Sequence, residues 1–104
     1  MLTLKLYQNG PLPPNGRTVI MECAGVWVDH CADGVKHVQV FKTKVGVQDE
    51  DGGHDFYVGG DYTPKWQNDE NGPTGAPPST ITPCNYFGWG VLENANGKTT
   101  EMFR

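Results

Sequence analysis

Four side chains that can bind a transition metal lie close together in the first part of the sequence. They are Cys23, His30, Cys31 and His37. Zinc prefers thiolate and imidazole ligands in tetrahedral geometry. The spacings lack the C-x₂₋₄-C and H-x₃₋₅-H pairs of zinc motifs, and His30 and Cys31 would point to opposite faces of a strand. We therefore predict no metal site, and interpret His30 and His37 as a pair facing each other across a hairpin.

A second group of potential metal ligands is acidic. Residues 49–55 contain four carboxylates around two glycines, and hard cations such as calcium prefer carboxylate oxygens. An EF-hand loop that began at Asp49 would need a polar ligand at its fifth position and a glutamate at its twelfth, where this sequence has Gly53 and Gly60. We interpret this segment as a solvated turn.

Catalytic motifs are absent from the sequence. The only serine, Ser79, has no nucleophile elbow around it, and the chain contains neither a P-loop nor a dinucleotide-binding glycine motif. A cysteine–histidine pair is conceivable, but nothing in the sequence orients one side chain on the other. We predict no catalytic residue and no cofactor. A small hydrolase or metal-binding protein stays as an alternative.

The potential binding residues gather in and around an acidic segment. Residues 49–70 contain seven acids and one base, which would attract a basic partner surface. Aromatic side chains flank this region and offer a large contact area at low entropic cost. The predicted binding residues are Tyr62, Trp66, Asp69, Glu70 and Trp89. Because Trp89 lies between Gly88 and Gly90, capture of a nucleotide or another small molecule is an alternative to protein binding.

The length and net charge of the chain limit the classes of protein to which it can belong. The chain has 104 residues and a formal net charge of −4, so we expect one domain, 1–104, and no binding to duplex nucleic acid. No apolar run is long enough to cross a bilayer. Three irregularly spaced cysteines do not resemble a secreted disulfide framework. These observations indicate a cytoplasmic protein that does not bind a membrane.

The elements that must position these residues are predicted to be strands. β-branched and aromatic residues are abundant, and no window has the apolar spacing of an amphipathic helix. Leu2, Leu4 and Leu6 alternate with more polar residues, which is typical of a strand with one buried face. We expect an all-β fold, a small antiparallel β-barrel or roll of about six strands, with long Gly/Pro-rich loops. The longest of these loops is predicted at residues 60–85.

Two dipeptides predict tight hairpins and set their registers. Asn96-Gly97 places Val91 opposite Met102. Asp33-Gly34, taken as a two-residue turn, places Val26 opposite Phe41 and His30 opposite His37. Gly25 interrupts the apolar run 18–29 and indicates a bend within it.

Several segments resemble those of small accessory proteins of bacteriophages. The segments are Leu-Lys-Leu-Tyr near the N-terminus, Arg-Thr-Val-Ile-Met-Glu, Asp-Phe-Tyr-Val-Gly-Gly and the closing Glu-Asn-Ala-Asn-Gly-Lys-Thr-Thr-Glu. Some members of that group bind a host defence component. The resemblance carries no binding motif that would assign a role to a residue. It implies a non-enzymatic binding module acting on a macromolecular partner, such as an inhibitor of a host protein.

Overall fold

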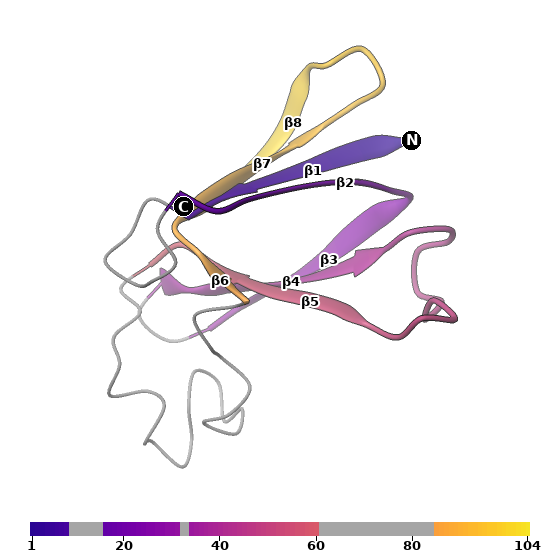
Figure 1. Cartoon of the computed structure of the whole chain (residues 1–104), viewed down its shortest axis with the longest axis horizontal. Coiled ribbons are helices and arrows are strands. Elements are labelled where there is room, and N and C mark those ends of the chain that lie inside the picture. Colours follow the sequence, from indigo (N-terminus) through magenta and orange to yellow (C-terminus); the bar gives the residue numbers. More distant parts are fainter. Residues whose placement is uncertain (9–15, 32–33, 61–84) are drawn as a thin grey trace.

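The computed structural model describes residues 1–8, 16–31, 34–60 and 85–104. Within these ranges the chain is all-β, as predicted, and its strands form two layers (Figure 1). The strands are β1 (Leu2–Tyr7), β2 (Thr18–Cys23), β3 (Gly25–His30), β4 (Lys36–Phe41), β5 (His54–Val58), β6 (Tyr86–Phe87), β7 (Trp89–Glu93) and β8 (Thr99–Phe103). The prediction of about six strands therefore undercounted the described strands.

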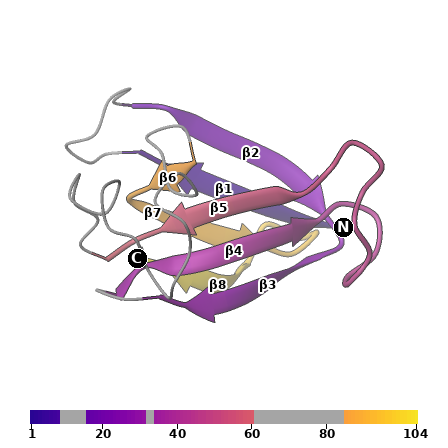
Figure 2. The ribbon, with the colours of Figure 1, turned by 90° about the horizontal axis from the view of Figure 1, so that it is seen from below.

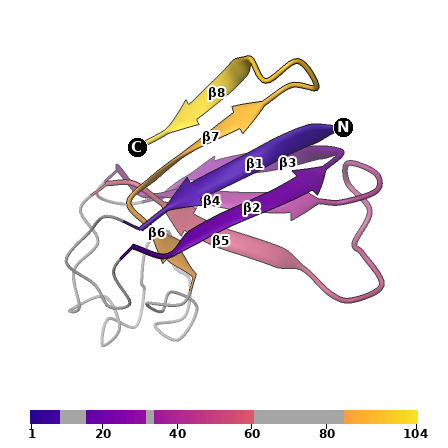
Figure 3. The same cartoon turned by 45° about the horizontal axis from the view of Figure 1, so that its top comes forward.

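The described strands form two separate sheets and not a closed barrel, which was one form of the β-barrel or roll that we expected. One sheet has the strand order β2-β1-β7-β8 and the other β3-β4-β5-β6. Figure 2 shows the second sheet in front of the first, and Figure 3 shows the first sheet from its outer side. Neighbouring strands are antiparallel except for the short parallel pair β5–β6.

The chain crosses between the two sheets at two short links, which explains the difference from a barrel. Ala24 separates β2 from β3, so the run 18–29 is divided between the sheets. Gly25 marks this bend as predicted, and a Cβ atom there would lie 2.6 Å from Val45 Cγ2. Gly88 separates β6 from β7 in the same way. Strands that are consecutive in the sequence therefore do not pair at these two points.

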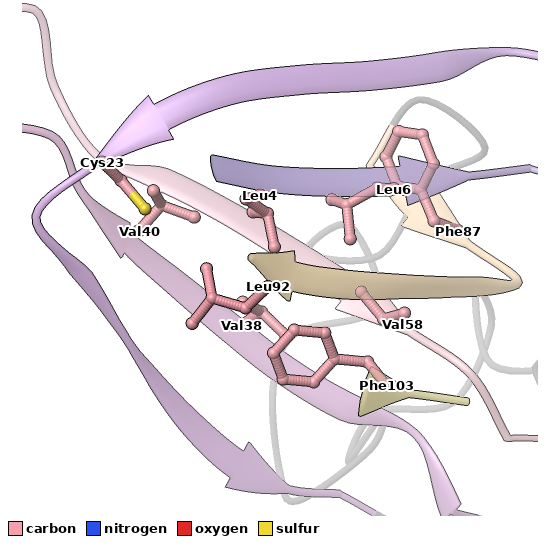
Figure 4. Packing of buried hydrophobic residues seen from close by; sticks show 9 residues of the cluster. All are labelled: Leu4, Leu6, Cys23, Val38, Val40, Val58, Phe87, Leu92 and Phe103. Atoms are coloured by element: carbon pink, nitrogen blue, oxygen red, sulfur yellow. The ribbon is translucent and has the colours of Figure 1, made fainter. Parts of the chain in front are cut away.

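The core lies between the facing sides of the two sheets (Figure 4). Alternate residues of β1 point inward, as the leucine pattern predicts. Each fully buried leucine or phenylalanine contributes about 1.5–3 kcal/mol to stability. The core residues are Leu4, Leu6, Cys23, Val38, Val40, Val58, Phe87, Leu92 and Phe103. Because one side of each sheet is buried here, the remaining residues of each strand lie on an outer face.

The predicted pairing of His30 with His37 is wrong by one residue. Asp29 lies opposite His37, and His30 lies opposite Lys36. The Cys31 amide donates a hydrogen bond to the Val35 carbonyl at 2.7 Å, so three residues, not two, connect the paired positions. Gly34 has a φ of +79°, as expected at the last position of a three-residue hairpin loop.

This register brings apolar residues together. Val26 pairs with Val40 and Val28 pairs with Val38, and all four lie on or against the core. The predicted register would have placed Val26 opposite Phe41. Burial of a complete apolar side of β3 therefore outweighs the local preference of Asp33-Gly34 for a two-residue turn.

β1–β2 and β7–β8 form two further hairpins, and the second lies where Asn96-Gly97 predicts one. β1 and β2 pair over their full length, and residues 9–15 of their connection lie outside the described residues. Val91 lies opposite Met102 in the β7–β8 hairpin, with a bulge between Leu92 and Glu93. β4 ends at Phe41.

Candidate functional site

The outer face of the β2-β1-β7-β8 sheet carries a group of apolar and aromatic side chains. Leu4, Leu6 and Leu92 are in the core, so the residues between them in sequence point outward. Cross-strand pairing places these outward residues in two adjacent rows. The group consists of Tyr7, Ile20, Trp89, Val91 and Met102, and we call it the Trp89 face.

Trp89 is stacked on Tyr7 across the β1–β7 pair. The two residues are partners in the strand register, and their ring centroids lie 4.3 Å apart with an interplanar angle of 23°. Trp89 nevertheless keeps 37% of its surface exposed. The stack fixes the orientation of the indole while leaving part of it accessible, so little side-chain entropy would be lost when a partner binds.

Apolar side chains continue the face beyond the aromatic pair. Ile20 and Met102 are both exposed. They are the two ends of a row of paired residues across the sheet, with Lys5 and Val91 between them. Val91 is buried, at 8% exposed. Exposed apolar side chains that gather on one face of a small protein often mark an interaction site.

The charges on this face are concentrated at the end away from Trp89. Glu22 and Glu93 both lie opposite Thr3. The Lys5 ammonium contacts Glu93 Oε1 at 2.9 Å, and the hydrogen bond to Glu93 raises the pKa of Lys5. Among these three charged groups the balance is one net negative charge.

The glycines around Trp89 serve packing between strands. Gly90 points toward the core, and a Cβ atom there would lie 2.5 Å from Leu6 Cδ2 and 2.7 Å from the Lys5 carbonyl oxygen. Phe87 is fully buried. The 87–90 segment therefore does not offer the open backbone that we considered for a nucleotide. The Tyr7 and Trp89 rings are already in contact, which leaves no space for a base between them.

On the outer face of the other sheet, the aromatic side chains contact neighbouring side chains of the same sheet. Trp27 packs edge-on against Phe41, with centroids 4.8 Å apart. His37 stacks on Tyr57, and its Nε2 lies 2.9 Å from Asp55 Oδ1. Trp27 is 53% exposed, and its register partner in β4 is the polar Gln39.

The loop after β4 brings together Asp49, Asp51 and His54. One ligand atom from each residue lies within 4.8 Å of the other two. Lys42 Nζ donates a hydrogen bond to Asp51 Oδ2 at 3.1 Å, and this contact lowers the pKa of Asp51. The sequence shows these carboxylates, but we interpreted their segment as a solvated turn and did not predict that His54 would join them.

The thiols and the other two histidines do not form a comparable group among the described residues. Cys23 and Cys31 are free cysteines. Cys23 is fully buried in the core, and burial raises the pKa of its thiol. Within the ranges that the structure describes, no metal-binding group includes Cys23, Cys31, His30 or His37.

Of the five predicted binding residues, the structure describes only Trp89. Tyr62, Trp66, Asp69 and Glu70 lie outside the described residues, as does most of the predicted loop 60–85. Sequence reasoning missed Tyr7 as the stacking partner of Trp89 and Ile20 as a member of the same face. The alternation of β1 identifies Tyr7 as outward-facing, but its pairing with β7 joins segments about eighty residues apart and has no local signal.

Comparisons with protein-family models, curated proteins and solved structures gave no match to this chain. No helix among the described residues is long and apolar enough to span a membrane.

Proposed function

We propose that this chain is a non-enzymatic binding module that docks a protein partner on the Trp89 face. The observation that carries the proposal is the partly exposed Trp89 ring, held against Tyr7 and continued by exposed apolar side chains. Tryptophan is enriched among the residues that dominate protein–protein affinity, especially where its position is fixed beforehand. Inhibition of a host protein, which the resemblance to phage accessory proteins implies, would be one consequence of such binding.

A protein surface fits this face better than a small molecule does. Small-molecule sites are concave and enclose most of the ligand, whereas the Trp89 face is one side of a sheet. The contact between Tyr7 and Trp89 also argues against capture of a base between aromatic rings. The alternative of nucleotide binding therefore has less support than protein binding.

The charges indicate what the partner surface carries. The end of the face with Glu22 and Glu93 has a net negative charge even after Lys5 is counted, and the whole chain has a net charge of −4. Complementary charge at the rim speeds association and suppresses wrong partners. We infer a partner with an apolar centre and a basic rim.

The test compares two tryptophans on opposite faces. Tagged wild-type chain, Trp89→Ala and Trp27→Ala are incubated with an extract of the natural host, and captured proteins are quantified by mass spectrometry. We expect one protein that wild type and Trp27→Ala capture equally and that Trp89→Ala captures less well by about tenfold or more, as for loss of a central tryptophan. The affinity difference is then measured with that protein purified.

Urea unfolding of all three chains checks that each variant remains folded. Equal capture by Trp89→Ala and wild type, or a loss confined to Trp27→Ala, would show that the Trp89 face is not the docking surface. A small bound mass on the native chain in place of a protein would favour the nucleotide alternative.

A further inference from the structure

We propose that Asp49, Asp51 and His54 form a binding site for a divalent transition-metal ion of the zinc type. The three residues come from the loop that follows β4 and from the first residue of β5. This site is separate from the Trp89 face, which lies on the other sheet, and the inference does not depend on the proposed function.

The separation of the donor atoms fits a tetrahedral ion. His54 Nε2 lies 3.4 Å from Asp51 Oδ1 and 3.7 Å from Asp49 Oδ2. Donors bound to zinc at about 2.1 Å in tetrahedral geometry are about 3.4 Å apart. The three donors therefore need only small movements to surround one ion, and a fourth position would be left for water or another ligand.

Asp49 offers the ion a carboxylate that is already held in place. Its side chain is only 6% exposed, and it accepts hydrogen bonds from the Lys42 backbone amide at 3.1 Å and from Thr43 Oγ1 at 3.4 Å. The ammonium of Lys42 contacts Asp51 instead. His54 Nε2 lies 3.7 Å from Asp49 Oδ2 and forms an ion pair with it only when the imidazole is protonated. A divalent ion would supply a permanent positive charge beside this largely buried carboxylate.

The mixture of donors selects the class of ion. Calcium and magnesium prefer sites made of oxygen atoms, and an imidazole nitrogen disfavours them. One imidazole with two carboxylates suits zinc and neighbouring divalent ions of the first transition row. A surface hollow lined by Asp49, Glu50 and Asp51 gives an ion access to the carboxylates.

The Lys42 ammonium would compete with the ion for the Asp51 carboxylate. Lys42 Nζ donates a hydrogen bond to Asp51 Oδ2, and this ion pair is largely exposed, so it contributes little to stability. A divalent ion bound at two carboxylates and an imidazole can displace such a weak pair. Loss of the lysine should therefore strengthen metal binding, whereas a merely structural ion pair would not respond in this way.

The test is a titration of the metal-free full chain with ZnCl₂, followed by calorimetry. We expect wild type to bind zinc, and His54→Gln to weaken binding by about tenfold or more, since even an outer-shell partner of a metal ligand contributes that much. The matched control is His37→Gln, which removes the other histidine that contacts an aspartate, and it should bind as wild type does. Lys42→Met should bind more tightly than wild type.

Titration with Co²⁺ identifies the donors. Nitrogen and oxygen ligands in tetrahedral geometry give visible d–d bands without the thiolate charge-transfer band that cysteine ligands produce. If His54→Gln does not fold, the exposed Asp51→Asn replaces it as the test variant. The proposal is overturned if wild type does not bind zinc, if His37→Gln loses binding as well, or if a thiolate band appears.

Discussion

Successive side chains along each strand alternate between the two sides of its sheet, and this alternation decides which side a residue faces. Trp89 points outward because the inward positions of β7 are taken by Gly90 and Leu92, which pack against Leu6 and Leu4 of β1. The same rule places Tyr57 on the outer side of β5, between Val58 of the core and Phe56, which packs against the core. Tyr57 is nevertheless buried, in a small cluster with Val35 and Tyr86.

The buried Tyr57 should make stability fall at high pH. Burial raises the pKa of Tyr57 to about 12, while an unfolded tyrosine ionises at about 10. The folded state therefore favours the neutral phenol, and this contribution is complete below about pH 10 and lost as the pH rises to about 12. Urea unfolding should show a free energy of unfolding that decreases over this window.

The control for this prediction is Tyr57→Phe, which keeps the ring and removes the ionisable group. Its free energy of unfolding should fall less steeply over the same pH window than that of wild type. In the native state, the ultraviolet titration of tyrosinate should lose its highest transition in the variant. An identical pH dependence in both proteins would mean that Tyr57 ionises normally.

At the scale of strands, local turn chemistry predicts hairpins but not how the hairpins assemble. The predicted pairing of Val91 with Met102 is present, but the Asn94 amide bonds to the Lys98 carbonyl around a three-residue loop, and a bulge between Leu92 and Glu93 restores the predicted register. Asp33-Gly34 indicates a hairpin at the right place but gives the wrong register, because the packing of Val26 and Val28 against the core decides it. A turn motif fixes only a few backbone angles, whereas the register also determines which side chains are buried.

The close pairing of β1 and β7 depends on the absence of a side chain at Gly90. Gly90→Ala would place a methyl group 2.7 Å from the Lys5 carbonyl oxygen, a backbone atom that cannot turn away. We expect a loss of about 1–3 kcal/mol in the free energy of unfolding, as for overpacking of a core. Because Trp89 precedes this position, its stacking on Tyr7 should weaken as well.

The matched control is Gly97→Asn in the β7–β8 turn. Gly97 has a φ of +79°, and a Cβ atom added there would meet no other atom within 4 Å. Asparagine tolerates this left-handed conformation. Urea unfolding should show a smaller loss for this variant than for Gly90→Ala. Equal losses would mean that strand spacing at Gly90 is not tightly constrained.

At the scale of the whole molecule, two links that switch sheets decide the architecture. The sequence predicts strands and most hairpins, and Gly25 indicates the bend at the first link, but neither link carries a signal that the chain continues in the other sheet. The candidate site likewise depends on the assembly of strands that lie far apart in the sequence. Trp89 was predicted as a binding residue from its type and neighbours, whereas the face around it forms only when β1, β2, β7 and β8 join into one sheet.

The central claim is that a protein partner contacts the outer side of the β2-β1-β7-β8 sheet. Photo-crosslinking tests it most directly, with a photoreactive amino acid placed at Met102 on that face or at Val47 in the loop after β4. These residues are similarly exposed, at 50% and 46%, so accessibility alone does not distinguish them. In complexes with the partner protein identified by the capture experiment, crosslinks to the partner should form from position 102 and not from position 47. Crosslinks from position 47 alone would contradict the account.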